Sequence, residues 1–306
     1  MKRKFNIGII FLFICAFIWG TTFVAQSLGS EYVGPFTYNA SRFLIAGIVL
    51  LVVTLVRKLI SRKTKKELKL IDKKGKSFKV IIFLIIGVGV ALFFGATLQQ
   101  VGIDITKSAA KSGFISSVYI VIVPFISLMF GKKVRPILFL FVFIALFGSL
   151  LIAVNQDFKF EIGDLITLSC AACFAFQISF IDIVNPNVDS IFLNAIQFIV
   201  SGTLSLVIAV IFEKDSMEMV IRALPAILYA ALLSGCIAYS FQIIGQKTTD
   251  ATVASLIMSL ESVFALLSGL IFMKEKLPIQ AYIGSILIFS AIILSQIRFK
   301  RVKKNV

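Results

Sequence analysis

The sequence contains no histidine, and this absence restricts the chemistry that the chain can perform. Histidine is the side chain whose charge changes most readily near neutral pH, and it is the commonest metal ligand. The chain has four cysteines, and its single C-x-x-C pattern, Cys170 and Cys173, lacks the second pair that a metal site needs. We therefore expect no metal site, no cofactor and no enzymatic activity, and we interpret the cysteines as small packing residues.

Charged residues are also scarce, since they form 15% of a chain that is 59% hydrophobic and has a mean hydropathy of +1.01. A water-soluble domain of this length could not bury so much apolar surface. A helix that crosses a bilayer needs about 20 mostly apolar residues. The sequence therefore predicts an all-α integral membrane protein with ten transmembrane helices. The predicted spans are 5–30, 35–56, 80–103, 112–131, 136–156, 165–181, 190–212, 223–246, 251–273 and 277–297.

The positive charge is distributed unevenly along the chain, whose formal net charge is +16. Threading the ten spans places most lysines and arginines, including the basic segment 57–79 and both chain ends, on one side of the membrane. Such an excess marks the cytoplasmic side. We therefore expect a multi-pass protein of the cytoplasmic (inner) membrane with both termini in the cytoplasm. We expect the basic loop 57–79 to attract anionic lipid, and we expect no nucleic-acid partner.

The two halves of the chain resemble each other, which predicts two five-helix repeats at 1–156 and 157–306. At one constant offset the matched pairs are Gly102/Gly245, Thr106/Thr249 and Ser112/Ser255. At a second offset they are Asn39/Asn194, Phe43/Phe198 and Gly47/Gly202. Because five spans is an odd number, the second repeat must have the opposite orientation in the membrane. Inverted repeats of this kind are typical of secondary transporters.

Glu261 is the most informative charge, because it lies near the middle of a predicted span. An ionised side chain there costs about 2.5–3.5 kcal/mol on insertion scales, so it should face the bundle interior or a wet cavity. In one interpretation, Glu261 contacts a cationic group of a substrate or binds and releases a coupling proton. In the other, it pairs with a basic residue or a helix end and holds the bundle together.

Two basic residues also fall within predicted spans. For Arg42 we favour a structural role, in which it extends outward to the interface or pairs with an acidic residue. Lys111 lies in a small, polar stretch suited to lining a cavity, where it either contacts an anionic group or extends outward. Pro124, inside the fourth span, predicts a kink that acts as a hinge or as a static bend. Neutral candidates for substrate binding are Trp19, Gln99, Tyr119, Gln177, Gln242 and Ser259, with Gln100 and Ser116 as weaker ones.

Four segments together resemble the EamA branch of the drug/metabolite transporter superfamily. They are Phe-Ile-Trp-Gly-Thr-Thr-Phe-Val at 17–24, Arg-Phe-Leu-Ile-Ala-Gly at 42–47, Ser-Gly-Phe-Ile at 112–115 followed by Val123 and Pro124, and Glu-Ser-Val-Phe-Ala at 261–265 followed by Glu275. The resemblance implies ten helices in a 5+5 inverted repeat, cytoplasmic termini, and transport, often export, of amino acids, metabolites or drugs. It also implies a central cavity in which Lys111, Tyr119, Gln242 and Glu261 would lie.

The function we expect is therefore secondary transport of a small metabolite by alternating access, with export as the expected direction. The sequence has no G-x-x-x-x-G-K-[ST] loop, so we expect no direct use of ATP. A uniporter or channel-like facilitator for a small organic solute is the alternative. A membrane enzyme would need clustered catalytic groups, which short loops without histidine do not supply.

Overall fold

The computed structural model describes residues 7–64, 68–73, 75–106, 109–153, 162–272 and 279–296, and within helices it leaves the side chains at 109–111, 153 and 272 undescribed. Over these residues the chain is helical and has no strand, apart from one isolated bridge between Ile71 and Val188. The predicted all-α fold is thus confirmed for the described part of the chain.

The helices of the first half are α1 (Ile7–Gly29), α2 (Pro35–Lys63), α3 (Phe78–Thr106), α4 (Ala109–Ser116), α5 (Tyr119–Met129) and α6 (Ile137–Ala153). Those of the second half are α7 (Ile162–Val184), η1 (Asn185–Asn187), α8 (Ser190–Phe212), α9 (Met217–Tyr229), η2 (Ala230–Tyr239), α10 (Ser240–Gln246), α11 (Ala251–Met258), α12 (Glu261–Phe272) and α13 (Ile279–Ser295).

Eight helical segments among the described residues are long and apolar enough to cross a membrane, and α6 and α13 are shorter apolar helices. The predicted span 190–212 coincides with α8, whereas α2 continues past the predicted end at 56 as far as Lys63. The helix continues beyond the apolar run because lysine and arginine disfavour a hydrocarbon environment but have good helix propensity. The predicted ends at 5–6, 154–156, 273, 277–278 and 297 lie outside the described residues.

Acidic side chains satisfy free N–H groups where helices begin. Asp189 accepts hydrogen bonds from the N–H groups of Ile191 and Phe192 at the start of α8. Glu213 reaches from the end of α8 to the start of α2, where its carboxylate accepts from the N–H and the hydroxyl of Thr37. Since the first N–H groups of a helix have no partner within it, these contacts fix where α2 and α8 begin.

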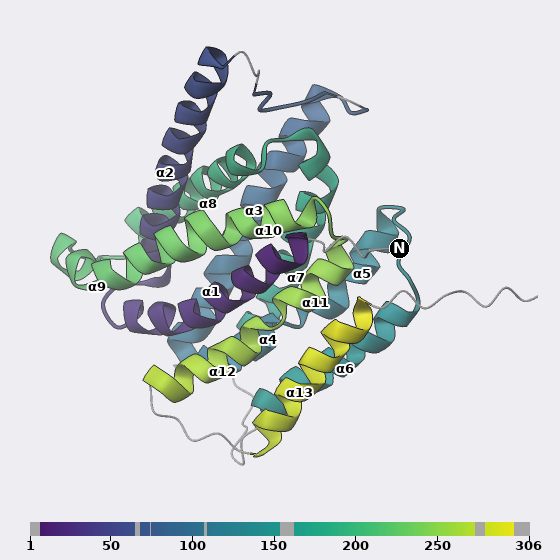
Figure 1. Ribbon diagram of the computed structural model, residues 1–306. Coiled ribbons are helices and arrows are strands. Elements are labelled where there is room, and N and C mark those ends of the chain that lie inside the picture. Colours follow the sequence, from purple (N-terminus) through teal and green to yellow (C-terminus); the bar gives the residue numbers. More distant parts are fainter. Residues whose placement is uncertain are drawn as a thin grey trace, which may run out of the picture.

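Three pairs of helices make the most extensive contacts: α3 with α7, α2 with α8, and α6 with α13 (Figure 1). Small residues allow α2 and α8 to pack closely. A Cβ at Gly47 would lie 3.2 Å from the Ile199 backbone nitrogen, and a Cβ at Gly202 would lie 3.0 Å from that of Leu44. Such close backbone approach is typical of helix pairs in lipid. The hydrophobic effect does not hold helices together there, and small residues allow the close van der Waals packing that does.

Two long helical segments are interrupted in their middle. Tight turns at Ser117–Val118 separate α4 from α5, and similar turns at Ser259–Leu260 separate α11 from α12. Pro124 lies inside α5, after the first interruption, and the second interruption has no proline at all. Proline therefore does not explain the interruptions. A third irregularity is η2, a π-helical stretch.

The basic segment 57–79 is held partly by protein. The backbone at Leu70 and Asp72 exchanges hydrogen bonds with that of Asp189 and Asn187, at 2.9 Å and 2.7 Å, so this stretch lies across the turn between α7 and α8. Arg57 pairs with the Asp189 carboxylate at 2.8 Å. We call the end of the bundle where α2 ends and α8 begins the basic end.

The Asp189 carboxylate stays charged in this setting. Burial alone would raise the pKa of Asp189, but hydrogen bonds from Arg57 and from the Phe192 N–H, with the positive charges of Arg57 and Lys247, hold that pKa below its ordinary value. Burial lowers the pKa of Lys247. A carboxylate that ties a basic side chain to a helix start stabilises the basic end at neutral pH.

Candidate functional site

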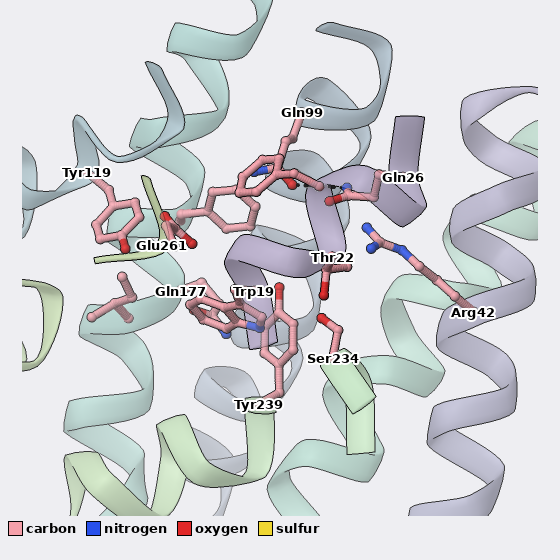
Figure 2. A pocket seen from close by; sticks show the side chains of 13 residues that line it. Trp19, Thr22, Gln26, Arg42, Gln99, Tyr119, Gln177, Ser234, Tyr239 and Glu261 are labelled. Carbon is pink, nitrogen blue, oxygen red and sulfur yellow. Dashed lines mark hydrogen bonds between the residues drawn. The ribbon is translucent and has the colours of Figure 1, made fainter. Parts of the chain in front are cut away.

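A pocket lies among α1, α2, α3, α5, α7, η2 and α12, and its volume is about 470 Å³ when the open solvent at its mouth is included (Figure 2). Its lining residues are Trp19, Thr22, Phe23, Gln26, Arg42, Gln99, Tyr119, Phe174, Gln177, Ile178, Ser234, Tyr239 and Glu261. Helices from both halves of the chain contribute to it, so the pocket exists only when the whole bundle is assembled.

Glu261 is the first residue of α12 and directly follows the interruption between α11 and α12. It is 4% exposed. Helix α1 approaches it closely, since a Cβ at Gly20 would lie 2.8 Å from the Glu261 carbonyl oxygen. The Tyr119 hydroxyl faces the carboxylate (Figure 2). Across the described part of the chain, no basic side chain forms an ion pair with Glu261. The start of a helix favours a negative charge, which eases the burial of this carboxylate.

Arg42 lies at another wall of the pocket and is 5% exposed. Its Nε donates a hydrogen bond of 2.9 Å to Asn39 Oδ1, and its guanidinium carbon lies 4.5 Å from the Phe43 ring centre and 5.3 Å from that of Tyr38. The end of the guanidinium points into the pocket (Figure 2). Within the described ranges it neither reaches the bundle surface nor pairs with a carboxylate, the two contacts through which a structural role was expected.

A first cluster of buried amides connects α1 with α3. Gln26 Nε2 lies 3.2 Å from Gln99 Oε1 and 3.0 Å from Gln100 Oε1, and Gln100 Nε2 donates to the Gln26 carbonyl at 3.1 Å. These bonds join the last turns of α1 to the second half of α3, on the side of the pocket away from the basic end. We call these three residues the first amide cluster.

A second amide cluster connects α7, α8 and α10. Gln242 Nε2 donates to Gln177 Oε1 at 3.2 Å, and Gln177 Nε2 donates to Gln197 Oε1 at 3.1 Å. Gln246 on the next turn of α10 donates to the Ile178 carbonyl at 2.9 Å. This cluster lies between the pocket and the basic end, so the two clusters flank the pocket along the bundle axis.

Two aromatic rings line the pocket between Glu261 and Arg42 (Figure 2). Trp19 and Tyr239 lie with ring centres 4.8 Å apart. Trp19 Nε1 is buried and has no hydrogen-bond partner among the described residues. Because buried polar atoms in native proteins are nearly always satisfied, this N–H group is a hydrogen-bond donor available to a solute in the pocket.

The structure brings six of the sequence-predicted residues into this pocket: Trp19, Arg42, Gln99, Tyr119, Gln177 and Glu261. Gln242 lies behind the wall, bonded to Gln177. Ser259 is buried at the interruption, where its hydroxyl donates to the Leu256 carbonyl. The Lys111 side chain lies outside the described residues, although its backbone belongs to α4.

Sequence reasoning missed four polar lining residues. Thr22 and Gln26 follow Trp19 by three and then four positions, so helical spacing could have placed all three on one face of α1. Ser234 and Tyr239 line the pocket from η2, where the wider π-helical turn shifts the face that a regular helix would present. No pattern in the sequence predicts that shift.

Two larger hollows lie nearer the surface. One, of about 1230 Å³, lies at the basic end between the α5–α6 connection and the start of α11. The other, of about 1660 Å³, is an apolar groove between α1, α9 and α12. Neither contains a buried charge without a partner, so the central pocket is the better candidate for a specific site. Among the described residues, no group of three cysteine or carboxylate side chains could hold a metal ion.

Several known proteins resemble the chain over most of its length. The sequence model of the EamA-like transporter family matches residues 6–154 and 161–296. An uncharacterized transporter from Archaeoglobus fulgidus is 30% identical over 299 residues, which cover 94% of this chain and 85% of that protein. The uncharacterized transporter YoaV from Bacillus subtilis is 24% identical over 307 residues, which cover 98% of this chain and 99% of that protein. A crystal structure of a protein with 19% sequence identity shares the fold, with a TM-score of 0.73 over 94% of this chain and 96% of that one. With its long apolar helices, the chain is a multi-pass membrane protein.

Proposed function

This chain belongs to the EamA-like transporter family, as its resemblance predicted, and on that premise we propose that it is a secondary transporter. It carries a small organic solute across the cytoplasmic membrane by alternating access, with export as the direction. Family membership points to transport and away from catalysis. The observation that carries the proposal is the central pocket, where Glu261 and Arg42 are buried without partners of opposite charge in the described structure.

Alternating access is commonly built on two similar halves, and we propose ten spans in two inverted five-helix repeats, 1–156 and 157–306. The contacts between α2 and α8 support the repeat, because they are reciprocal. Gly47 packs against Ile199 and Gly202 against Leu44, and Leu44 and Ile199 are matched positions in the alignment of the halves. The family model also matches the chain twice.

A second set of reciprocal contacts supports the same symmetry. Gly102 packs against the carbonyl of Gly163 on α7, and its matched residue Gly245 packs against the carbonyl of Gly8 on α1. Gly8 and Gly163 are themselves matched positions at the second offset. This reciprocity supports an axis that exchanges the halves and relates the α3–α7 contact to the α10–α1 contact, as the proposed inverted repeat requires.

We further propose that the basic end faces the cytoplasm, with both termini on that side. The exposed side chains of the 57–79 segment then lie at the cytoplasmic surface, where anionic lipid attracts basic residues. Part of this segment already has protein partners, namely Arg57, Lys76 and the stretch 68–73. We therefore expect the remaining basic side chains of the segment to contact lipid.

The two amide clusters supply a physical basis for alternation. The first cluster holds α1 against α3 on the outer side of the pocket, and the second holds α10 against α7 on the cytoplasmic side. Opening one side requires that its amides exchange their hydrogen bonds for water, while the other cluster stays closed. The interruptions at Ser117–Val118 and Ser259–Leu260 provide points where α5 and α12 can bend.

Proton coupling is a separate part of the proposal. A single buried carboxylate that faces a pocket can bind a proton in one state of the cycle and release it in another. If so, transport by the Glu261→Gln variant would lose its dependence on a pH gradient. A channel-like facilitator is the alternative function, and it predicts no stimulation by solute on the far side of the membrane.

The proposal is tested with purified protein in liposomes. A thermal-shift screen of amino acids, polyamines and purines identifies a ligand, because binding to the folded state raises the apparent melting temperature. The ligand is then loaded inside the vesicles and uptake of labelled ligand is measured. The expected result is uptake that internal ligand stimulates, that is at least about tenfold weaker in Glu261→Gln, and that is unchanged in the surface variant Glu218→Gln. Uptake that ignores internal ligand would show a channel, and no uptake of any solute would refute the proposal.

A further inference from the structure

The central pocket presents opposite charges from opposite walls. Glu261 projects from α12 beside Tyr119, and Arg42 projects from α2 beyond Thr22 (Figure 2). Trp19 and Tyr239 lie between them in the same view. Within the described structure the two charges do not pair with each other or with any other ionised side chain.

Two buried charges that are not paired with each other restrict what can bind in the pocket. A buried charge is costly unless an opposite charge or several hydrogen bonds compensate it. A purely cationic solute would satisfy Glu261 and leave Arg42 unpaired, and a purely anionic solute would do the reverse. A solute with both charges compensates both walls at once.

The surroundings of Arg42 indicate how an anion would bind. Its Nε is already bonded to Asn39, which fixes the plane of the guanidinium and leaves the two Nη atoms directed at the pocket. A planar carboxylate can accept from both Nη atoms together, as arginine–carboxylate pairs commonly do. In the second half, the matched residue Gln197 is uncharged and bonded to Gln177 and Asn194, so only one wall has this anion site.

Resting on the transport function proposed above, we propose that the substrate is a zwitterion whose cationic and anionic groups are separated by an apolar stretch. Its ammonium group binds Glu261, its carboxylate binds Arg42, and the methylene groups between them lie against Trp19 and Tyr239. A solute with both charges on one carbon should bind less tightly, because Trp19 and Tyr239 lie between the two charged residues and its charges cannot lie on either side of these rings.

The test compares isomers in a binding assay on the purified, full-length protein. The probes are 6-aminohexanoate, its isomer 2-aminohexanoate with adjacent charges, hexanoate and hexylamine, with shorter and longer ω-amino acids to find the best length. We expect the best ω-amino acid to bind at least about tenfold more tightly than the other three types, since each of those leaves one charge without its partner.

Two variants assign the ends of the solute. In Arg42→Gln, which copies the residue found at the matched position of the second half, hexylamine should bind as well as the ω-amino acid. In Glu261→Gln, hexanoate should do so. Unliganded melting temperatures establish that each variant is folded, and Glu218→Gln, an exposed residue outside the pocket lining, should leave the preference intact.

Tighter binding of 2-aminohexanoate than of every ω-amino acid, or no binding across the series, would overturn the inference. Failure of this substrate class can be distinguished from failure of the proposed transport function. If another solute shows counterflow that Glu261→Gln abolishes, the transporter stands and only this substrate class falls. If no solute shows counterflow, the transport function itself falls.

Discussion

Among single residues, Glu261 and Arg42 combine nearly complete burial with the lack of an oppositely charged neighbour in the part of the chain that the structure describes. Sequence alone could predict that both were unusual, because a charge within an apolar span is costly. It could not predict that they face one pocket. That depends on the crossing of α1 over α12 at Gly20, which the residue types do not encode in any local pattern.

The first prediction concerns stability and transport together. Glu261→Gln should fold and melt at the same temperature as the wild type or higher, because it removes a buried charge that no described residue compensates. Transport should fall at least about tenfold, since the lost interaction is a charge-assisted one. Melting temperature and counterflow measured on the same preparation check both halves. A variant that melts far lower would show that Glu261 holds the bundle together.

A second prediction at this scale concerns pH. The pKa of Asp189 is lower in the folded protein, where Arg57 and helix N–H groups bind its charged form. A lowered pKa stabilises the fold above the ordinary aspartate pKa of about 3.9, and that stabilisation is lost as the pH falls through the folded value. Asp189→Asn should therefore melt lower than the wild type at pH 7, by at most about 1 kcal/mol of stability, because asparagine caps a helix as well as aspartate does but cannot form the ion pair with Arg57.

Melting curves recorded from neutral pH down to about pH 3 check this, because the ordinary aspartate pKa falls inside that range. The gap between wild type and Asp189→Asn should close at the acid end. A gap that stays constant with pH would mean that the Asp189 charge contributes nothing to the basic end.

At the scale of elements, the sequence did not predict the interruptions between α4 and α5 and between α11 and α12, because both segments are predominantly apolar. The sequence directed attention to Pro124 as a hinge, yet the structure keeps α5 helical through Pro124 and breaks the segment before it, at Ser117–Val118. The hinge role of Pro124 stays a prediction. Pro124→Ala should restore one backbone hydrogen bond, and unchanged transport rates in that variant would make it a static bend.

The crossing of α1 and α12 gives a sharper prediction. A Cβ at Gly20 would lie 2.8 Å from both the Ala265 nitrogen and the Glu261 carbonyl oxygen, so backbone would have to move. Gly20→Ala should destabilise the protein by about 1–3 kcal/mol, as overpacked sites do, and displace Glu261.

Gly113→Ala is the matched control, because its nearest neighbour is the Ala265 side chain at 3.3 Å. It should melt close to the wild type. Equal melting temperatures for Gly20→Ala and the wild type would contradict the close crossing on which the position of Glu261 depends.

For the whole molecule, apolar runs and charge scarcity predicted an all-helical membrane protein, and motif order predicted its family; both are confirmed. The pocket was only partly predictable. Thr22 and Gln26 were not predicted, although helical spacing from Trp19 could have identified them. Ser234 and Tyr239 depend on the π-helical stretch η2, for which short-range sequence gives no signal.

The central claim is that the pocket opens in turn to the two sides of the membrane. The direct test introduces Ser234→Cys, a pocket residue that is 3% exposed, into a chain whose four native cysteines have been replaced. Membrane-impermeant thiol reagents are applied to sealed, oriented vesicles from each side, with Leu12→Cys, a fully buried position outside the pocket, as the control. Reaction of the Ser234→Cys thiol from both sides, slowed by a bound ligand, is the predicted result. Protection from both sides, equal to that of the Leu12→Cys control, would contradict it.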